Sequence, residues 1–406
     1  MELLKHEWKK IWNPLLVLVL LLLGVLYYYL FCDFYIEFFH NGAPTKAAFS
    51  LSAAWAEAYG PTMETEERAG LDEQLTAEYE RFAECVQACD RAADYGIVDW
   101  DSFDDFYQNY YESARERGGE WEEEKERVIG LIVNNSNYHE IVFLQRAIET
   151  YDRLENEIPP NLNYDGIGDS DTLRTKKLAR IREIKDSDMV HGYLPVNIID
   201  NTWSYAARMA VWCILSVILL LSPTLVRDRL RRTRSMQWTS RKGRRIWNTQ
   251  LLAAVISAIA LTALNMIAYT LPFLAQGPLV FKDFRLFSFL WFGIPWVDWT
   301  YGRYLIVIEI MIFLMTMTAA GFTVMLSQYS GHYIAMLLKA LPLFTVMAYI
   351  SAGVLLDRSF FFGNPLSEWL ELPGAELLGI AALILTAAAL VVIAWARQTR
   401  REIEIN

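Results

Sequence analysis

Six stretches of the sequence are long, strongly apolar and almost free of Asp, Glu, Lys and Arg. A bilayer core about 30 Å thick needs roughly 20 apolar residues in a helix, and each stretch is long enough. A buried helix of a soluble protein rarely stays apolar on every face over that length. We therefore expect an all-α, multi-pass membrane protein. The expected spans are residues 14–32, 204–226, one within 246–281, 304–326, 333–355 and 377–396.

Lys and Arg gather in three short segments, which all fall on one side of the membrane if there are six spans. Positive charge resists translocation, so this side should be the cytoplasm and both termini should lie there. The segments are Lys5 to Lys10 before the first span, Arg227 to Arg245 after the second, and Arg397 to Arg401 after the last.

The segment 33–203 has the opposite charge. It holds 36 acidic and 16 basic residues, a net −20, whereas the rest of the chain carries +9. With this topology it forms an acidic extracytoplasmic domain between the first and second spans. Its pattern predicts helices at about 46–59, 62–94, 99–117, 120–133, 137–157 and 171–186. Apolar residues at helical spacing predict its core, namely Tyr79, Phe82, Val86, Tyr107, Tyr110 and Tyr111.

Two further segments are expected at the membrane surfaces. Residues 1–13 place Leu4, Trp8, Ile11 and Trp12 on one helical face beside lysines, the pattern of a helix lying in the cytoplasmic interface. Residues 282–303, within the remaining membrane region 248–406, are dense in aromatic rings. They either lie along or dip into the outer leaflet, or cap a helix hairpin by aromatic packing alone; both interpretations stay open.

The sequence contains no motif for catalysis, for a cofactor or for a metal. It has no GxxxxGK[ST] phosphate loop and no Gly-Lys pair, so it cannot bind ATP in the P-loop manner. The histidines and cysteines have no metal-ligand spacing, and Cys85 and Cys89 are expected to be free thiols. The basic loop is short and adjoins two spans, which argues against binding of nucleic acid.

Polar side chains inside the expected spans are few. Charges within a bilayer are costly and point to function, so Glu309 and the amide Asn265 are possible parts of a translocation path. The alternative for Glu309 is a hydrogen bond within the bundle. Lys339 should lie near the opposite surface, so we expect it to snorkel to the cytoplasm and not to pair with Glu309.

The membrane part, about 1–32 and 200–406, resembles the membrane subunits of bacterial ABC transporters of the type 2 export class. In that family a charged segment after the second span runs into a Thr-x-x-x-Gly-Arg stretch, and Thr239, Gly243 and Arg244 match it. The family also has an interfacial N-terminal helix, six spans and a short basic tail. An acidic residue usually opens the charged segment, whereas Asp228 here is surrounded by arginines.

The resemblance implies a permease subunit in a bacterial cytoplasmic membrane, present as two copies or with a homologue and surrounded by membrane lipid. Two separate ABC ATPase subunits would bind the ATP and magnesium, so this chain would hold no cofactor. The basic loop 227–247 would dock into the ATPase and couple hydrolysis to transport. The coupling residues would be Arg227, Asp228, Leu230, Met236, Thr239, Gly243 and Arg244.

The expected substrate is a peptide, a lipid-like or a drug-like molecule, because similar outer insertions occur in members linked to peptide export or antimicrobial-peptide resistance. One alternative is a sensor or resistance protein whose outer domain binds a ligand without moving it. Another is an ABC subunit that drives an outer partner mechanically, although that class usually has four spans. In each case we expect the outer domain to be a gate or binding module and not an enzyme.

Overall fold

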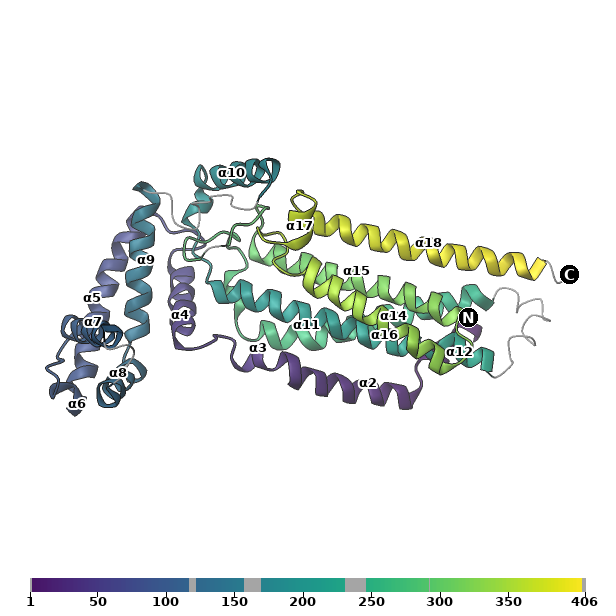
Figure 1. The fold of residues 1–406 in the computed structure, drawn as a ribbon, viewed down its shortest axis with the longest axis horizontal. Helices are drawn as coiled ribbons and strands as arrows, with labels where there is room; N and C mark the ends of the chain where they lie inside the picture. The colour runs from purple at the N-terminus through teal and green to yellow at the C-terminus, as the bar shows by residue number, and fades with distance from the viewer. Residues whose placement is uncertain (1, 117–121, 157–168, 231–245, 292, 404–406) are drawn as a thin grey trace.

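The computed structural model describes residues 2–116, 122–156, 169–230, 246–291 and 293–403. Within these ranges the chain is helical, with isolated β-bridges and no sheet. Figure 1 shows a bundle of long helices with a group of shorter helices at one end. We call that end of the bundle the domain end. The opposite end, where the first helix and the last helix's final turns lie, is the termini end.

The six expected spans are all present as helices long and apolar enough to cross a membrane. They are α2 (Pro14–Tyr27, continued by a π-helical turn to Cys32), α11 (Val196–Leu221), α14 (Ile246–Leu274), α15 (Tyr301–Gln328), α16 (Tyr333–Ala348, continued by a π-helical segment to Leu355) and α18 (Ala375–Ile403). α15 has 28 residues and so is about 42 Å long, more than a bilayer core. The helix of the second span begins at Val196, ahead of the expected residue 204.

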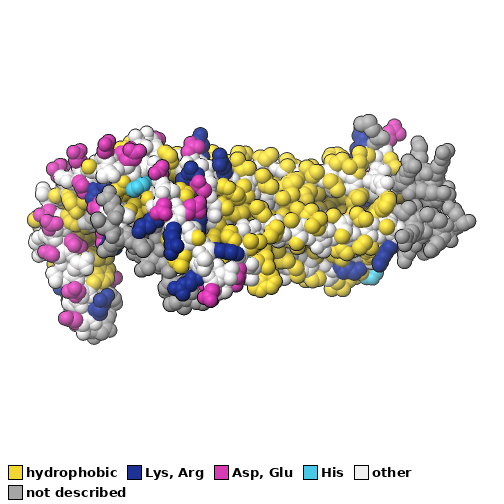
Figure 2. All heavy atoms as spheres, turned by 90° about the horizontal axis from the view of Figure 1, so that it is seen from above, with side chains coloured by type: hydrophobic (Ala, Val, Ile, Leu, Met, Phe, Trp, Pro, Cys, Tyr) yellow, Lys and Arg dark blue, Asp and Glu magenta, His cyan; other side chains and the backbone are white. Residues whose placement is uncertain are grey.

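The surface of the bundle is a belt of hydrophobic side chains (Figure 2). Charged side chains lie on the domain beside it and reappear at the termini end. Exposed leucines and isoleucines on α2, α14, α16 and α18 make up much of this belt. A soluble protein rarely exposes so large an apolar surface, so the belt agrees with a membrane setting.

Local capping explains where two of the spans begin. The Asn13 side chain accepts a hydrogen bond from the Leu15 amide at 3.0 Å, and Pro14 occupies the first helical position, where no amide donor is needed. Nδ1 of His332 likewise accepts from the Ala335 amide at 3.2 Å. This cap starts α16 and confirms the expected break between the fourth and fifth spans.

The N-terminal helix is α1 (Glu2–Ile11). Unlike the expected interfacial helix, it turns part of its apolar face toward the bundle. Ile11 and Trp12 pack against the bundle at the termini end, and Trp12 Nε1 donates to Ser257 Oγ of α14 at 3.0 Å. Trp8 is 39% exposed. Part of the apolar face is therefore satisfied by protein, because α14 lies alongside it.

Between the first two spans, the described residues form eight α-helices. They are α3 (Phe34–Glu37), α4 (Ala43–Ala58), α5 (Thr65–Gln87), α6 (Asp90–Ala93), α7 (Trp100–Glu116), α8 (Glu123–Asn135), α9 (Tyr138–Asn156) and α10 (Asp171–Lys185). The single helix expected over 62–94 is interrupted, because Cys89 adopts an extended backbone conformation. α6 then turns inward and buries Ala92.

The core of this helical group lies between α5, α7, α8 and α9. Phe82, Val86 and Tyr110 are buried as expected, and Tyr79 and Tyr107 pack against the same core. The prediction for Tyr111 is wrong, since its side chain is 39% exposed. One residue along a helix rotates a side chain by about 100°, so Tyr110 and Tyr111 cannot both face inward.

The aromatic segment 282–303 lies on protein. Its described residues before α15 form an irregular loop that buries Phe287 and Phe289. The Phe289 amide donates to the Gly192 carbonyl at 2.8 Å, and a Cβ on Gly192 would lie 2.6 Å from the Phe287 carbonyl oxygen. The structure thus favours a cap with aromatic packing, but built from a loop and not from helices.

Candidate functional site

Glu309 lies on α15 and faces α14. Its Oε1 accepts a hydrogen bond from Thr270 Oγ1 at 2.7 Å. Its Oε2 is buried and has no hydrogen-bond partner among the described residues. A carboxylate oxygen left unpaired in apolar surroundings is costly, so this one requires an explanation.

Glu309 lines a cavity of about 790 Å³ at the domain end of the bundle. α11 contributes Thr202, Tyr205, Ala206 and Met209; α14 contributes Met266, Thr270, Phe273 and Leu274; α15 contributes Leu305, Ile306, Ile308, Ile310 and Phe313. Exposed charged residues at its rim are Lys282, Asp283 and Arg303. A cavity of this size and apolar character can hold a drug-sized or single-chain lipid-like molecule. We call it the Glu309 groove.

Asn265 lies in a different environment. Its Oδ1 accepts from Trp212 Nε1 at 3.3 Å and its Nδ2 donates to Ser216 Oγ at 2.8 Å, which joins α14 to α11. It lines a second cavity, of about 660 Å³, between α2, α11 and α14. The structure therefore does not bring Asn265 and Glu309 together in one cavity.

α2 closes the Asn265 cavity on one side and meets the bundle at a glycine. A Cβ on Gly24 would lie 2.9 Å from the Trp212 ring, too close for an unaltered contact. Tyr269 donates its hydroxyl to the Gly24 carbonyl at 2.9 Å. α2, the least buried of the six spans, therefore contacts α11 and α14 at a small residue.

Lys339 is bound at the termini end, away from Glu309. Its Nζ donates to the Tyr329 carbonyl at 3.1 Å and to Ser330 Oγ at 3.3 Å, just past the end of α15. A cation is favourable there because the last carbonyls of a helix carry partial negative charge. The expectation that Lys339 does not pair with Glu309 is confirmed.

The expected coupling loop is described only at its start. Arg227 lies in α12 (Pro223–Leu230), and its Nη1 donates to the Lys10 carbonyl of α1 at 3.1 Å. Asp228 and Leu230 belong to the same helix, but their side chains lie outside the described part. Outside the described residues altogether lie Met236, Thr239, Gly243 and Arg244.

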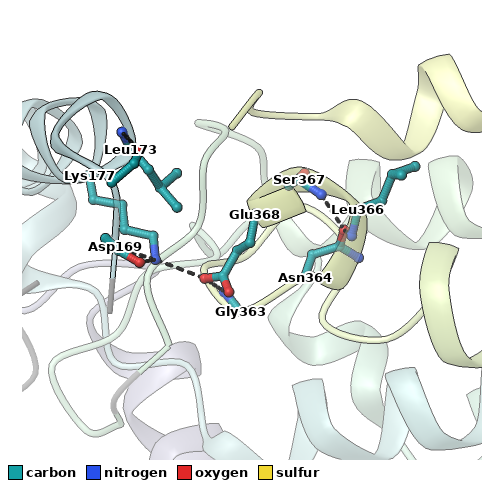
Figure 3. Close-up of polar contacts among 9 residues, drawn as sticks. Asp169, Leu173, Lys177, Gly363, Asn364, Leu366, Ser367 and Glu368 are labelled. Carbon is teal, nitrogen blue, oxygen red and sulfur yellow. Dashed lines mark hydrogen bonds and ion pairs between the residues drawn. The ribbon is translucent and has the colours of Figure 1, made fainter. Parts of the chain in front are cut away.

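An ion pair between a buried lysine and a partly exposed glutamate joins the helical group to the bundle (Figure 3). Lys177 of α10 is 4% exposed; its Nζ lies 2.8 Å from Glu368 Oε1 and 3.1 Å from Asp169 Oδ2. Glu368 belongs to α17 (Pro365–Trp369), a short helix between the fifth and sixth spans. The Gly363 amide also donates to Glu368 Oε1, at 3.0 Å. We call this set the Lys177 latch.

Other contacts strengthen the same junction. Arg180 Nε donates to the Pro295 carbonyl at 2.9 Å, and Lys176 Nζ donates to the Glu371 carbonyl at 2.6 Å. α10 is therefore held by both loops that cap the bundle. A displacement of either loop has to move α10 or break these bonds.

Glu376, at the start of α18, is a fully buried acid that no pattern in the sequence points to. It accepts from the Phe360 amide at 2.9 Å and from Ser367 Oγ at 3.0 Å. Unlike Glu309, both of its oxygens have partners. Glu376 therefore holds the loop before α17 in place, whereas Glu309 retains an unused acceptor.

Among the described residues, no group of three or more His, Cys, Asp or Glu side chains is placed to hold a metal ion. Residues 11–396 match a family model described as ABC-2 family transporter protein. No curated protein matches the chain, and no solved structure matches it.

Proposed function

The chain belongs to the ABC-2 family of transporter proteins, and from this membership we propose that it is the permease subunit of an ATP-driven exporter. Membership makes it a membrane component of an ABC transporter and implies a partnering ATPase subunit. The family match over residues 11–396 is the observation that carries the proposal. The proposed substrate is a peptide, a lipid-like or a drug-like molecule, moved outward across a bacterial cytoplasmic membrane.

The proposed orientation puts the termini end in the cytoplasm. Both chain termini lie at that end (Figure 1), so Lys5 and Lys9 of α1 and Arg397 near the end of α18 belong to it. Positive charge is retained on the cytoplasmic side. The helical group α3–α10 is then extracytoplasmic, and the Glu309 groove lies in the outer half of the membrane. This position suits a site from which a substrate leaves outward.

The proposed coupling element is α12 with the loop that follows it. The bond between Arg227 and Lys10 joins α12 to α1, and α1 is packed on α14. A push by the ATPase on α12 would therefore reach the first and third spans through α1. These contacts support the role of α12 in coupling. The docking of α12 and its loop on the ATPase rests on the family resemblance.

The test is co-purification of the chain with its ATPase, with nucleotide hydrolysis measured in nanodiscs. The double variant Leu230→Asp, Met236→Asp should insert normally but lose association with the ATPase by at least tenfold. Val98→Asp, at an exposed apolar residue of the helical group, is the matched control and should associate normally. Full association and full stimulated hydrolysis by the double variant would show that the loop only anchors topology.

The same complex, reconstituted in vesicles instead of nanodiscs, separates export from sensing without transport. An exporter accumulates substrate inside inverted vesicles only when ATP is supplied and the ATPase is intact. A sensor binds ligand with or without the ATPase and accumulates none. ATP-independent binding with no accumulation would favour the sensor.

A further inference from the structure

We propose that the Glu309 groove binds an amphiphile that has an apolar chain and one protonated amine, with the amine at Glu309. The inference rests on the proposed export function for its purpose, but the binding chemistry follows from the groove itself. It names the substrate class that the groove selects. Three features of the groove support it: an unpaired acceptor, donors that are already bonded elsewhere, and an open side.

The Glu309 carboxylate supplies the acceptor for the amine. Glu309 is half-buried and lines the groove, and its Oε2 has no hydrogen-bond partner among the described residues. Thr270 satisfies only Oε1. An N–H group arriving in the groove would satisfy Oε2, and a positive charge on that group would offset the cost of a carboxylate among apolar side chains.

Two hydroxyl groups, those of Thr202 and Tyr205, line the same groove as Glu309. Tyr205 donates its hydroxyl to the Tyr269 carbonyl at 2.6 Å, and Thr202 Oγ1 donates to the Ile198 carbonyl at 2.7 Å. These hydroxyls are committed elsewhere. The groove therefore offers a buried acceptor, Oε2 of Glu309, and a ligand has to bring the donor. An anionic ligand would be repelled by the carboxylate. A purely apolar ligand would leave Oε2 unpaired.

The groove opens toward the apolar belt of the bundle. The open side of the groove is bordered by Ile306 and Ile310, which are 62% and 52% exposed on the apolar belt. The groove is thus continuous with the surface that faces the bilayer chains. A molecule with an alkyl chain can enter sideways from the bilayer and place its amine inward. The charged residues at the rim are Arg303, in the first turn of α15, and Lys282 and Asp283, in the loop that precedes this helix.

The experiment measures binding of tritiated dodecylamine to the full-length chain in phosphatidylcholine nanodiscs, with N-dodecylacetamide as the competitor of equal chain length. The wild type should bind the amine at least tenfold more tightly than the amide. Glu309→Gln should lose this discrimination. Asp357→Asn makes the same carboxylate-to-amide change at an exposed residue outside the groove and should keep the discrimination.

A second variant covers the case in which Glu309→Gln does not fold. Ile306→Trp adds apolar bulk on an exposed position and fills the groove, so binding of both ligands should fall at least tenfold. Equal binding of amine and amide by the wild type, or tenfold discrimination retained by Glu309→Gln, would overturn the proposal. Undiminished amine binding by Ile306→Trp would do the same.

Two more arms identify the source of the amine and isolate the site from the transport function. Phosphatidylethanolamine added to the discs would displace dodecylamine if the natural ligand is a membrane lipid, and would not displace it if the ligand is a free amine. Tighter binding of the amine than of the amide, dependent on Glu309 but without ATP-driven accumulation, would support the amine site and contradict the export function. ATP-driven accumulation that is unchanged in Glu309→Gln would support the export function and contradict the proposed amine site.

Discussion

The guanidinium of Arg68 joins α5 to α9 through a two-pronged contact with a single carboxylate. Its Nε and Nη2 lie 2.7 Å from the two oxygens of Asp152. These hydrogen bonds hold the pKa of Asp152 below its ordinary 3.8. Planar two-pronged pairs are the strongest of the surface ion pairs.

Asp152→Asn should therefore destabilise the helical group, but modestly. Asp152 is 54% exposed, so solvent screens the pair and the expected loss is about 0.5–1 kcal/mol. Because the folded pKa is the lower one, the advantage of the wild type is complete above pH 3.8 and disappears as the pH falls through the lowered pKa. Thermal midpoints at neutral and acid pH measure this. Asp105→Asn, at an exposed residue of α7, is the control; an advantage that persists in acid contradicts the assignment.

A buried tyrosine network joins α11 to α15 and gives a second residue-scale prediction. Trp203 Nε1 donates to the Tyr304 hydroxyl at 2.6 Å, and the same hydroxyl lies 3.1 Å from Ser359 Oγ. Tyr304→Phe should cost about 1–3 kcal/mol because it strands buried polar groups. Tyr301→Phe should cost less, since its partner Thr202 keeps the bond to a backbone carbonyl. Calorimetry in detergent should show the larger fall for Tyr304→Phe; equal falls would refute the network's role.

Between elements, the Lys177 latch is the contact that ties α10 to α17. Breaking a buried pair leaves an uncompensated charge, at about 3–5 kcal/mol when both partners are buried. Glu368 is 37% exposed, so about 2 kcal/mol is expected for Lys177→Met. Hydrogen exchange should then rise in residues 358–368. Lys177→Arg keeps the positive charge and should keep most of the protection; if it loses as much as Lys177→Met, the latch is not electrostatic.

The elements themselves could be predicted because their signals are local. Charge-free length predicted all six spans, and turn residues at 327–332 correctly divided the fourth from the fifth. Helical spacing placed α4, α7, α8, α9 and α10 within a few residues. The break at Cys89 has no signal in the sequence, because nothing in the residue types near it forbids a helix.

The contacts between elements could not be predicted, because they join residues far apart in the chain. Glu376 cannot be recognised from the sequence, because it borders a charge-free run and resembles an ordinary span boundary. Lys177 stands in a basic stretch typical of a solvated helix, and only the fold places Glu368 opposite it. Glu309 was found because a charge inside a span is a local anomaly, whereas its unpaired oxygen depends on where α14 lies.

On the scale of the whole molecule, charge is separated along the long axis. The segment 33–203 carries a net −20 and the rest of the chain +9. Acidic side chains are spread over the domain in Figure 2, and the apolar belt separates them from the positive termini end. The domain therefore projects a negative field into the solution that it faces, which by the proposed orientation is outside the cell.

This field should gather cationic ligands near the proposed exit side, and its reach should depend on salt. Exposed charges act over about 30 Å at 0.01 M salt but only about 8 Å at physiological ionic strength. A cationic peptide should therefore associate with the full-length chain in nanodiscs at least tenfold faster at the lower salt, because steering acts on the association rate. A peptide of the same length with the charges reversed is the control and should associate more slowly as salt is removed. Stopped-flow fluorescence measures both rates. An association rate that does not change with salt, or one that favours the anionic peptide, would mean that the acidic domain does not attract cationic ligands.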